Sequence, residues 1–289
     1  MRDRLDPLIA ERAPWLFRPH PATRAARRVA EYVLRHNETV ELVHRFRDMP
    51  MHQIMVTLTN RIARDVQITG VQHIPRSGPA LVVANHPTGI ADGIILYHAF
   101  ASSRPDLFIF ANSDILRVLP QMQKLILPVE WRLDRRNYEK TKKTMQLTGA
   151  ALSKGRMGII FPSGRLAKRR QLHLYERTWM QSAVMIAQKF DVPIVPVNIQ
   201  ARNSALFYLL DLLHPTLRDI TLFHETLNKD RQPFRVHISA PVLRQDLPEK
   251  RSDAIDLLRR RTLALGQNPA GGVSLVKCSA GYQAILETS

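Results

Sequence analysis

The sequence predicts an α/β fold: a layered, mixed and largely parallel sheet flanked by helices, with an N-terminal helical hairpin. Two observations lead to this prediction. Short apolar runs alternate with longer helical patterns between about residues 66 and 242, an order typical of strands joined by crossover helices. Several runs are almost continuously apolar, as strands buried on both faces require. We therefore expect an amphipathic helical segment over residues 1–65, a main domain over 66–245, and a helix with a tail over 246–289.

The individual elements follow from the same patterns. Strands are expected over residues 66–69, 80–84, 107–111, 125–131, 157–161, 194–199, 220–223 and 234–239. Apolar residues at helical spacing predict helices over 89–101, 136–153, 174–190 and 251–265. From Thr23 to Arg64 the apolar residues also recur at helical spacing, among many cations, which predicts the hairpin. Its outer face either covers the core or also contacts a membrane surface.

The composition indicates an anionic partner and a reducing compartment. Lys and Arg number 42 against 25 Asp and Glu, giving a net charge of +17, which suits nucleic acid, anionic lipid, or a phosphorylated or acidic carrier. Cys278 is the single cysteine, which excludes an internal disulfide and a multi-cysteine zinc site. The N-terminus lacks a signal-peptide core, and no stretch reaches about 18 uncharged apolar residues. We expect a cytoplasmic protein with peripheral membrane contact.

The most informative motif is Asn85-His86-Pro87-Thr88-Gly89-Ile90-Ala91-Asp92, which follows a buried strand directly and leads into a helix. His86 is expected at the strand end, where the following proline biases it away from helical geometry. The spacing brings Asp92 under the imidazole only if the chain folds back at Gly89. A neutral histidine oriented by a carboxylate can take a proton from a hydroxyl. The spacing alone equally fits a structural histidine, so the interpretation depends on the strand-turn-helix setting.

A basic segment follows the strand expected over residues 125–131. Arg132 and Arg135 lie just past that strand, and arginine binds phosphate through two parallel hydrogen bonds. They are candidates for holding a substrate phosphate. Pairing with Glu130 and Asp134 on a solvated surface is the alternative.

A second basic turn begins at Phe161-Pro162-Ser163-Gly164-Arg165 and continues through Lys168. Gly164 permits close backbone approach, and exposed amides with Arg165 suit a phosphate. The serine-hydrolase elbow Gly-x-Ser-x-Gly needs glycines at 161 and 165, where Phe161 and Arg165 stand, which disfavours Ser163 as a nucleophile. A plain turn with a basic surface is the alternative.

The fourth block is a later run, Val192-Pro193-Ile194-Val195-Pro196-Val197, which reads as a strand flanked by prolines. Such a strand suits either an edge beside a cleft or a plain structural strand.

Taken in order, these four blocks resemble the motifs of the glycerolipid acyltransferase family, also called PlsC-like. That family has Asn-His-x4-Asp, an arginine-bearing segment after a strand, Phe-Pro-Glu-Gly-Thr-Arg-Ser, and Val-Pro-Ile-x-Pro-Val. The likeness covers roughly residues 66–242 and implies the acyltransferase-like α/β fold.

The resemblance implies transfer of a fatty acyl group from an acyl-CoA or acyl-carrier-protein thioester to a hydroxyl of a lysophospholipid or related lipid. It implies no metal, no cofactor and no acyl-enzyme, and action on the inner face of an anionic membrane. His86 becomes the general base and Asp92 its orienting partner. The candidate substrate-binding residues are Asn85, Arg132, Arg135, Ser163, Gly164, Arg165 and Lys168.

The sequence departs from the family pattern in two places. His86 and Asp92 are separated by one residue more than usual, so the turn must differ. The third block has Ser163 in place of glutamate and Arg165 in place of threonine. A variant branch associated with amino-acid-containing lipids is similar in three segments, Asn203-Ser204-Ala205-Leu206-Phe207, Phe223-His224-Glu225 and Pro233-Phe234-Arg235-Val236. The acceptor therefore stays open.

Two other function classes stay open on the sequence. A nucleic-acid-binding module would use the charge, but it requires stacking aromatics among the cations, and the basic runs contain few. A lipid hydrolase would use the same histidine and aspartate to activate water.

Overall fold

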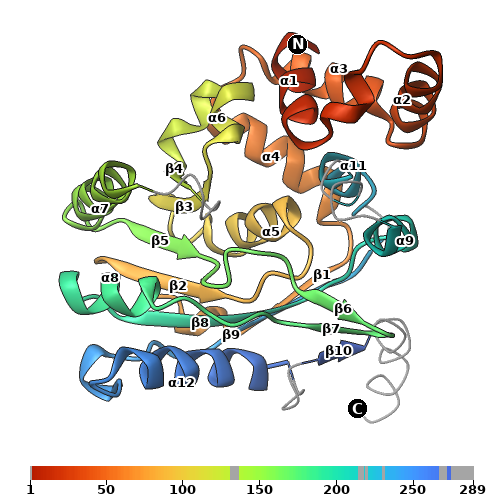
Figure 1. Cartoon of the computed structure of the whole chain (residues 1–289). Helices are drawn as coiled ribbons and strands as arrows, with labels where there is room; N and C mark the ends of the chain where they lie inside the picture. The colour runs from red at the N-terminus through yellow and green to blue at the C-terminus, as the bar shows by residue number, and fades with distance from the viewer. Residues whose placement is uncertain are drawn as a thin grey trace.

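The computed structural model describes residues 2–130, 137–213, 218, 221–229, 232–266 and 272–274. A seven-stranded sheet with the order β1-β9-β8-β2-β5-β3-β4 forms its centre (Figure 1). Its strands are β1 (Val66–Thr69), β2 (Ala80–Ala84), β3 (Leu107–Asn112), β4 (Ile126–Val129), β5 (Met157–Ile160), β8 (Ile194–Gln200) and β9 (Phe234–Ile238). The pairs from β8 to β4 are all parallel, whereas β9 runs antiparallel to β8 and parallel to β1. The sheet is therefore mixed and largely parallel, as the sequence predicts.

Helices cover both faces of this sheet (Figure 1). After β1 the main helices are α5 (Ile90–Phe100), α6 (Asp114–Val118), α7 (Tyr138–Leu152), α8 (Ser182–Phe190), α9 (Ala205–Leu213), α11 (Leu222–Leu227) and α12 (Arg251–Ala264). Strand β2 shows why two layers are needed, because its side chains alternate between the faces. Val82 and Ala84 join the core beneath α5, whereas Leu81 and Val83 join the core beneath α8 and α12.

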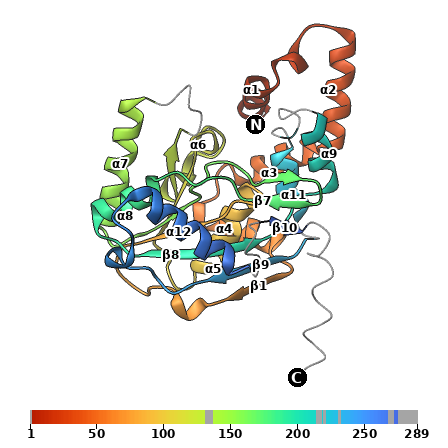
Figure 2. The ribbon, with the colours of Figure 1, turned by 60° about the horizontal axis from the view of Figure 1, so that its bottom comes forward.

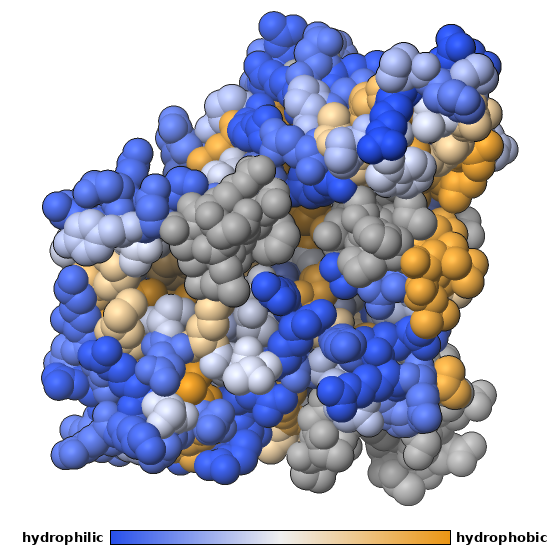
Figure 3. All heavy atoms as spheres, viewed as in Figure 1, coloured by the Kyte–Doolittle hydropathy of each residue, from blue (hydrophilic) through white to orange (hydrophobic). Residues whose placement is uncertain are grey.

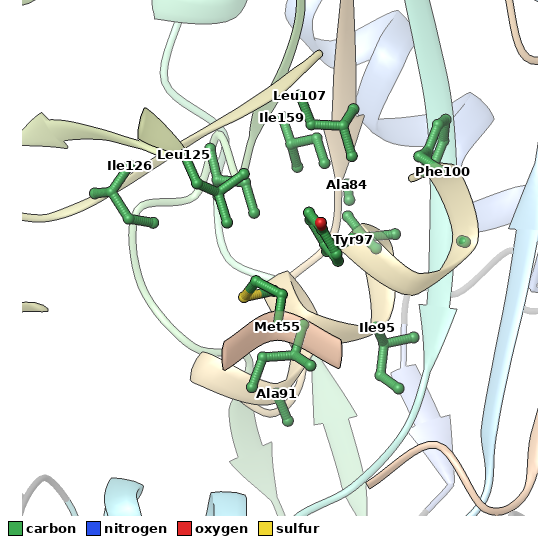
Figure 4. Close-up of a cluster of buried hydrophobic side chains, with 14 of the residues drawn as sticks. Met55, Ala84, Ala91, Ile95, Tyr97, Phe100, Leu107, Leu125, Ile126 and Ile159 are labelled. Carbon is green, nitrogen blue, oxygen red and sulfur yellow. The ribbon is translucent and has the colours of Figure 1, made fainter. Parts of the chain in front are cut away.

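The core on the α5 side also takes in the N-terminal helices (Figure 4). Met55 of α4 packs there with Ile95 and Tyr97 of α5 and with Leu125. Four helices precede the sheet, where the sequence predicts a hairpin: α1 (Arg2–Arg12), α2 (Pro21–Val33), α3 (His36–Phe46) and α4 (Met51–Ile62). In the described part of the chain, no helix has both the length and the apolar character needed to cross a bilayer.

A small antiparallel sheet of three strands, in the order β10-β7-β6, lies beside the main one. Its strands are β6 (Lys168–Arg170), β7 (His173–Tyr175) and β10 (Gly272–Ser274). The helix expected over residues 174–190 is therefore wrong in its first half, because α8 begins only at Ser182. The strand expected over 220–223 is also wrong, since Thr221 lies in a turn and α11 starts at Leu222. Glu225 and Lys229 form an i,i+4 ion pair there, which helical spacing allows.

Candidate active site

The candidate site lies at the carboxyl end of β2, the strand between β8 and β5 at the middle of the sheet. Every residue of β2 is buried, and the chain leaves it at Asn85 to form the turn before α5. Ligand sites in α/β sheets usually lie at this edge, where strands end and helices begin. The turn after β5, with Phe161 and Ser163, reaches the same edge because β2 and β5 are parallel neighbours.

His86 and Asp92 face each other across this turn. The Nδ1 atom of His86 lies 2.8 Å from Oδ2 of Asp92. The Asp92 side chain is fully buried, whereas that of His86 is 19% exposed. The Phe161 ring stacks on the imidazole with 4.2 Å between centroids. Since Nδ1 faces the carboxylate, Nε2 is the nitrogen on the opposite edge of the ring.

Asp92 accepts three further hydrogen bonds, all from the turn itself. The backbone N–H groups of Thr88 and Gly89 each donate to Oδ2 at 2.9 Å. The Thr88 hydroxyl donates to Oδ1. Asp92 thus also caps the first turn of α5. With these donors in place, the carboxylate accepts a proton-bearing Nδ1 and fixes that tautomer of His86.

Gly89 accommodates the extra residue between His86 and Asp92. Its backbone adopts φ 101 and ψ −126, a region open essentially to glycine alone. A Cβ at this position would also lie 3.3 Å from side-chain carbons of Leu166 and Leu222. The chain therefore turns back at Gly89, and the longer loop still brings the carboxylate to the imidazole.

Asn85 lies at the base of the turn and is buried. Its amide nitrogen donates to the carbonyl of Ile199 at 2.8 Å, and its amide oxygen accepts the Ile199 N–H at 2.7 Å. The side chain thus joins the end of β2 to β8. Both polar atoms of this predicted substrate-binding residue already have partners within the protein.

The third block forms a tight turn at the same edge. Ser163 is buried and its hydroxyl donates to the carbonyl of Arg165 at 2.9 Å. Gly164 has φ 59, and its N–H donates to the carbonyl of Phe161 at 2.9 Å. Arg165 and Lys168 are exposed on the rim. Arg132 and Arg135, the other predicted phosphate contacts, lie outside the described residues.

Sequence reasoning missed a further cation beside this rim, Arg177. Its Nε donates to the carbonyl of Leu166 at 2.8 Å. Burial lowers the pKa of the Arg177 guanidinium, and the nearby Arg218 and Arg165 lower it further, while Asp211 and Glu176 act the other way. An anionic group bound between Arg165 and Arg177 would relieve this repulsion.

Among the described residues, no group of three or more His, Cys, Asp or Glu side chains is arranged to hold a metal ion.

Comparison with known proteins identifies the domain that carries this site. Residues 65–200 match the family model described as Acyltransferase. These residues make up slightly less than half of the chain, and this part of it is similar to that family. The matched residues contain the turn of residues 85–92 that carries the His86–Asp92 dyad (the dyad turn), the turn of residues 161–165 (the Ser163 turn), and β8.

Individual acyltransferases resemble the chain at low identity. The lyso-glycine lipid O-acyltransferase of Phocaeicola vulgatus is 22% identical over 195 residues, which are 65% of this chain and 68% of that protein. The lyso-glycine lipid O-acyltransferase of Bacteroides thetaiotaomicron is 23% identical over 145 residues, or 50% of this chain and 52% of that protein. Among solved structures, the 1-acyl-sn-glycerophosphate (LPA) acyltransferase PlsC from Thermotoga maritima aligns over 92% of this chain and 97% of that chain, with 14% identity and a TM-score of 0.49.

The roles of two buried acidic residues near this site were also not predicted from the sequence. Glu176 follows β7 and accepts the backbone N–H of His86 at 3.1 Å. Burial raises the pKa of its carboxyl group, while hydrogen bonds from His86 and Trp179 and the nearby Ser163 side chain oppose that rise. The sequence offers no local signal for this contact, which spans 90 positions.

The second acidic residue is Glu225 in α11. It lies 3.0 Å from Nζ of Lys229, and both side chains are almost fully buried. The Lys229 ammonium also donates to Oδ1 of Asn203 at 2.7 Å, and the Ser204 N–H donates to Glu225 at 2.8 Å. These residues fall within or beside the segments that resemble the amino-acid-lipid branch. The sequence therefore indicated the segments, but not the ion pair and hydrogen bonds that join them.

Proposed function

We propose that this acyltransferase moves a fatty acyl group from an acyl-CoA or acyl-carrier-protein thioester to a hydroxyl of a lysolipid, with His86 as general base. The observation that carries this proposal is the 2.8 Å bond between Nδ1 of His86 and the buried carboxylate of Asp92. It leaves Nε2 to accept a proton, and the charge that then forms on the imidazole is balanced by Asp92.

The reaction needs no protein nucleophile. Nε2 of His86 takes the proton of the acceptor hydroxyl while its oxygen attacks the thioester carbonyl carbon. The resulting tetrahedral intermediate expels the thiolate, which takes up the proton from the imidazolium. The products are the acylated lipid and a free thiol, and the histidine returns neutral. Transfer is direct, without an acyl-enzyme.

The cations on the rim suit the charged ends of both substrates. Arg165 and Lys168 are exposed beside the dyad turn, and Arg177 lies close enough to Arg165 for their charges to repel. Phosphate or carboxylate groups of a carrier or a lysolipid would bind such a cluster through charge-assisted hydrogen bonds. Two of the relatives are named lyso-glycine lipid O-acyltransferases, which supports an acceptor that carries an amino-acid head group.

An anionic membrane surface is the proposed place of action. Leu209, Leu212 and Leu213 on one face of α9 are 56%, 66% and 67% exposed. On α2, Val29 and Tyr32 are 63% and 86% exposed. Figures 1 and 2 both place α9 below α2 on the same side of the molecule, and Figure 3 shows hydrophobic residues at this edge. Exposed leucines next to a basic helix are typical of interfacial binding.

Product analysis tests the transfer reaction. Purified protein is incubated with a long-chain acyl-CoA or acyl-carrier protein, with and without a lysophospholipid or a lyso-amino-acid lipid, and the products are identified by mass spectrometry. The proposal predicts an acylated lipid and release of thiol only when an acceptor is present. Free fatty acid formed at the same rate without any acceptor would instead identify a hydrolase.

Vesicle flotation tests the membrane surface. The protein is mixed with vesicles of phosphatidylglycerol and phosphatidylcholine or of phosphatidylcholine alone. The double variant Leu212→Ser/Leu213→Ser should bind anionic vesicles more weakly than wild type. Leu147→Ser is the matched control, since Leu147 is an exposed leucine on α7, and it should bind like wild type. Equal binding by all three proteins would contradict the assignment of this surface.

A further inference from the structure

A carboxyl group contacts the Ser163 turn, although Ser163 stands where the resembled motif has glutamate. The group belongs to Glu176, thirteen positions further along the chain. Glu176 is 5% exposed, and the Ser163 side chain lies close enough to lower the pKa of its carboxyl group. Both residues therefore lie together beneath the edge of the sheet that carries the dyad.

The Glu176 carboxyl group connects the dyad turn to the core. Its Oε2 accepts the backbone N–H of His86 at 3.1 Å, and its Oε1 accepts the indole N–H of Trp179 at 2.9 Å. Trp179 is 3% exposed and packs in the core beneath α8 and α12. The position of the carboxyl group is thus fixed from the side away from the dyad.

The same chain segment also holds the other polar backbone group of His86. The Ala167 N–H donates to the carbonyl of His86 at 2.9 Å. Helix α12 anchors this segment, because Arg259 donates to the carbonyls of Glu176 at 2.8 Å and Arg177 at 3.2 Å. Both backbone hydrogen-bonding groups of His86 are therefore bound by residues 167–176, far from it in sequence.

We propose that Glu176 is a positioning residue, whose carboxyl group holds the His86 backbone and so directs the imidazole toward the acceptor hydroxyl. The inference rests on the proposed role of His86 as base. Rotation of the His86 peptide would swing Nε2 away from the hydroxyl even while Nδ1 stays bonded to Asp92. A displacement of about 1 Å costs roughly 10²-fold in rate.

Glu176→Gln tests this role with little change in shape. The amide has only one acceptor oxygen, and its NH2 group faces an N–H donor, so one of the two contacts is lost. We expect kcat for acyl transfer to fall about 10- to 100-fold with little change in KM.

Glu249→Gln serves as the matched control, because it makes the same change at an exposed position away from the site. It leaves the contacts of Glu176 in place, so kcat should stay near that of wild type. Circular dichroism and Tm show whether each variant is folded. Unchanged kcat in folded Glu176→Gln would overturn the role of Glu176, as would equal kcat losses in Glu176→Gln and Glu249→Gln. Absence of transfer by wild type itself would overturn the proposed function instead.

Discussion

Asp92 and Glu225 are both fully buried carboxylates, yet their surroundings differ in kind. Asp92 is held by two backbone N–H groups, a hydroxyl and an imidazole. Glu225 is held by the ammonium of Lys229 at 3.0 Å, together with Ser204. The charge of Glu225 is therefore already balanced by a full positive charge. Asp92 also attracts the Lys229 charge but has no ion pair with it, so its charge remains available to balance a proton arriving on His86.

This difference in surroundings suits the two residues to different roles. A carboxylate with neutral donors and a histidine is suited to catalysis, because the charge it stabilises appears only during the reaction. A carboxylate paired with a buried lysine is suited to joining parts of the fold. In this chain the Glu225 pair joins α11 to the loop after β8, through Asn203 and Ser204.

Among the variants that probe this comparison, the largest effect is expected from Asp92→Asn. It should lower kcat roughly 10²- to 10³-fold, because the neutral amide no longer balances the imidazolium, while the weakened helix cap costs only about 0.5–2 kcal/mol of unfolding free energy. Steady-state transfer assays and urea unfolding measure the two effects. Asp256→Asn, at an exposed position on α12, is the control and should match wild type. Near-normal kcat in Asp92→Asn would remove the contrast between the two carboxylates.

Lys229→Met should instead lower stability strongly and kcat little. It leaves the Glu225 charge buried and unpaired, so the free energy of unfolding should fall by about 3–5 kcal/mol, while kcat per folded molecule changes little. Adding Glu225→Leu should restore much of the lost stability, since replacement of both ions by apolar groups is often close to neutral. If the double variant were no more stable than Lys229→Met, the ion-pair explanation would fail.

Gly89→Ala tests the dyad turn through its backbone. The φ of 101 should cost about 1–3 kcal/mol, and the added methyl group would crowd Leu166 and Leu222. We expect kcat to fall as the turn shifts Asp92 from His86. Gly78→Ala is the comparison, because Gly78 also has a positive φ of 78 but open space around its Cβ position. Its stability should fall without loss of kcat, and equal kcat in the two variants would contradict a special role for Gly89.

The smallest effect is expected from pH. Burial lowers the pKa of His36, His224 and His237 below the ordinary value of 6.5. The unfolded chain then binds protons more readily than the folded protein, so stability falls as pH drops through that value. Tm should decrease between about pH 7.5 and about pH 5.5, and less steeply in His237→Gln. A Tm that rises over this range would contradict the sign of these shifts.

The dyad turn was predictable because its determinants are local. A buried strand, Pro87 and Gly89 lie within a few residues of each other, and the structure has the strand, the fold-back and the helix in that order. The β6 and β7 strands were missed because they are short and mostly polar, with no apolar pattern. The contact of Glu176 with His86 spans 90 positions, and no local pattern encodes such a pairing. The strand expected over 220–223 failed because a short apolar run fits strand and helix equally.

His86→Ala in the acyl-transfer assay tests the central claim most directly, with His98→Ala as control because His98 is an exposed histidine on α5. Single-turnover rates are compared using the acceptor that wild type acylates. The account predicts that His86→Ala loses roughly 10²- to 10⁴-fold in rate, while His98→Ala keeps the wild-type rate. A wild-type rate in folded His86→Ala would contradict His86 as the base.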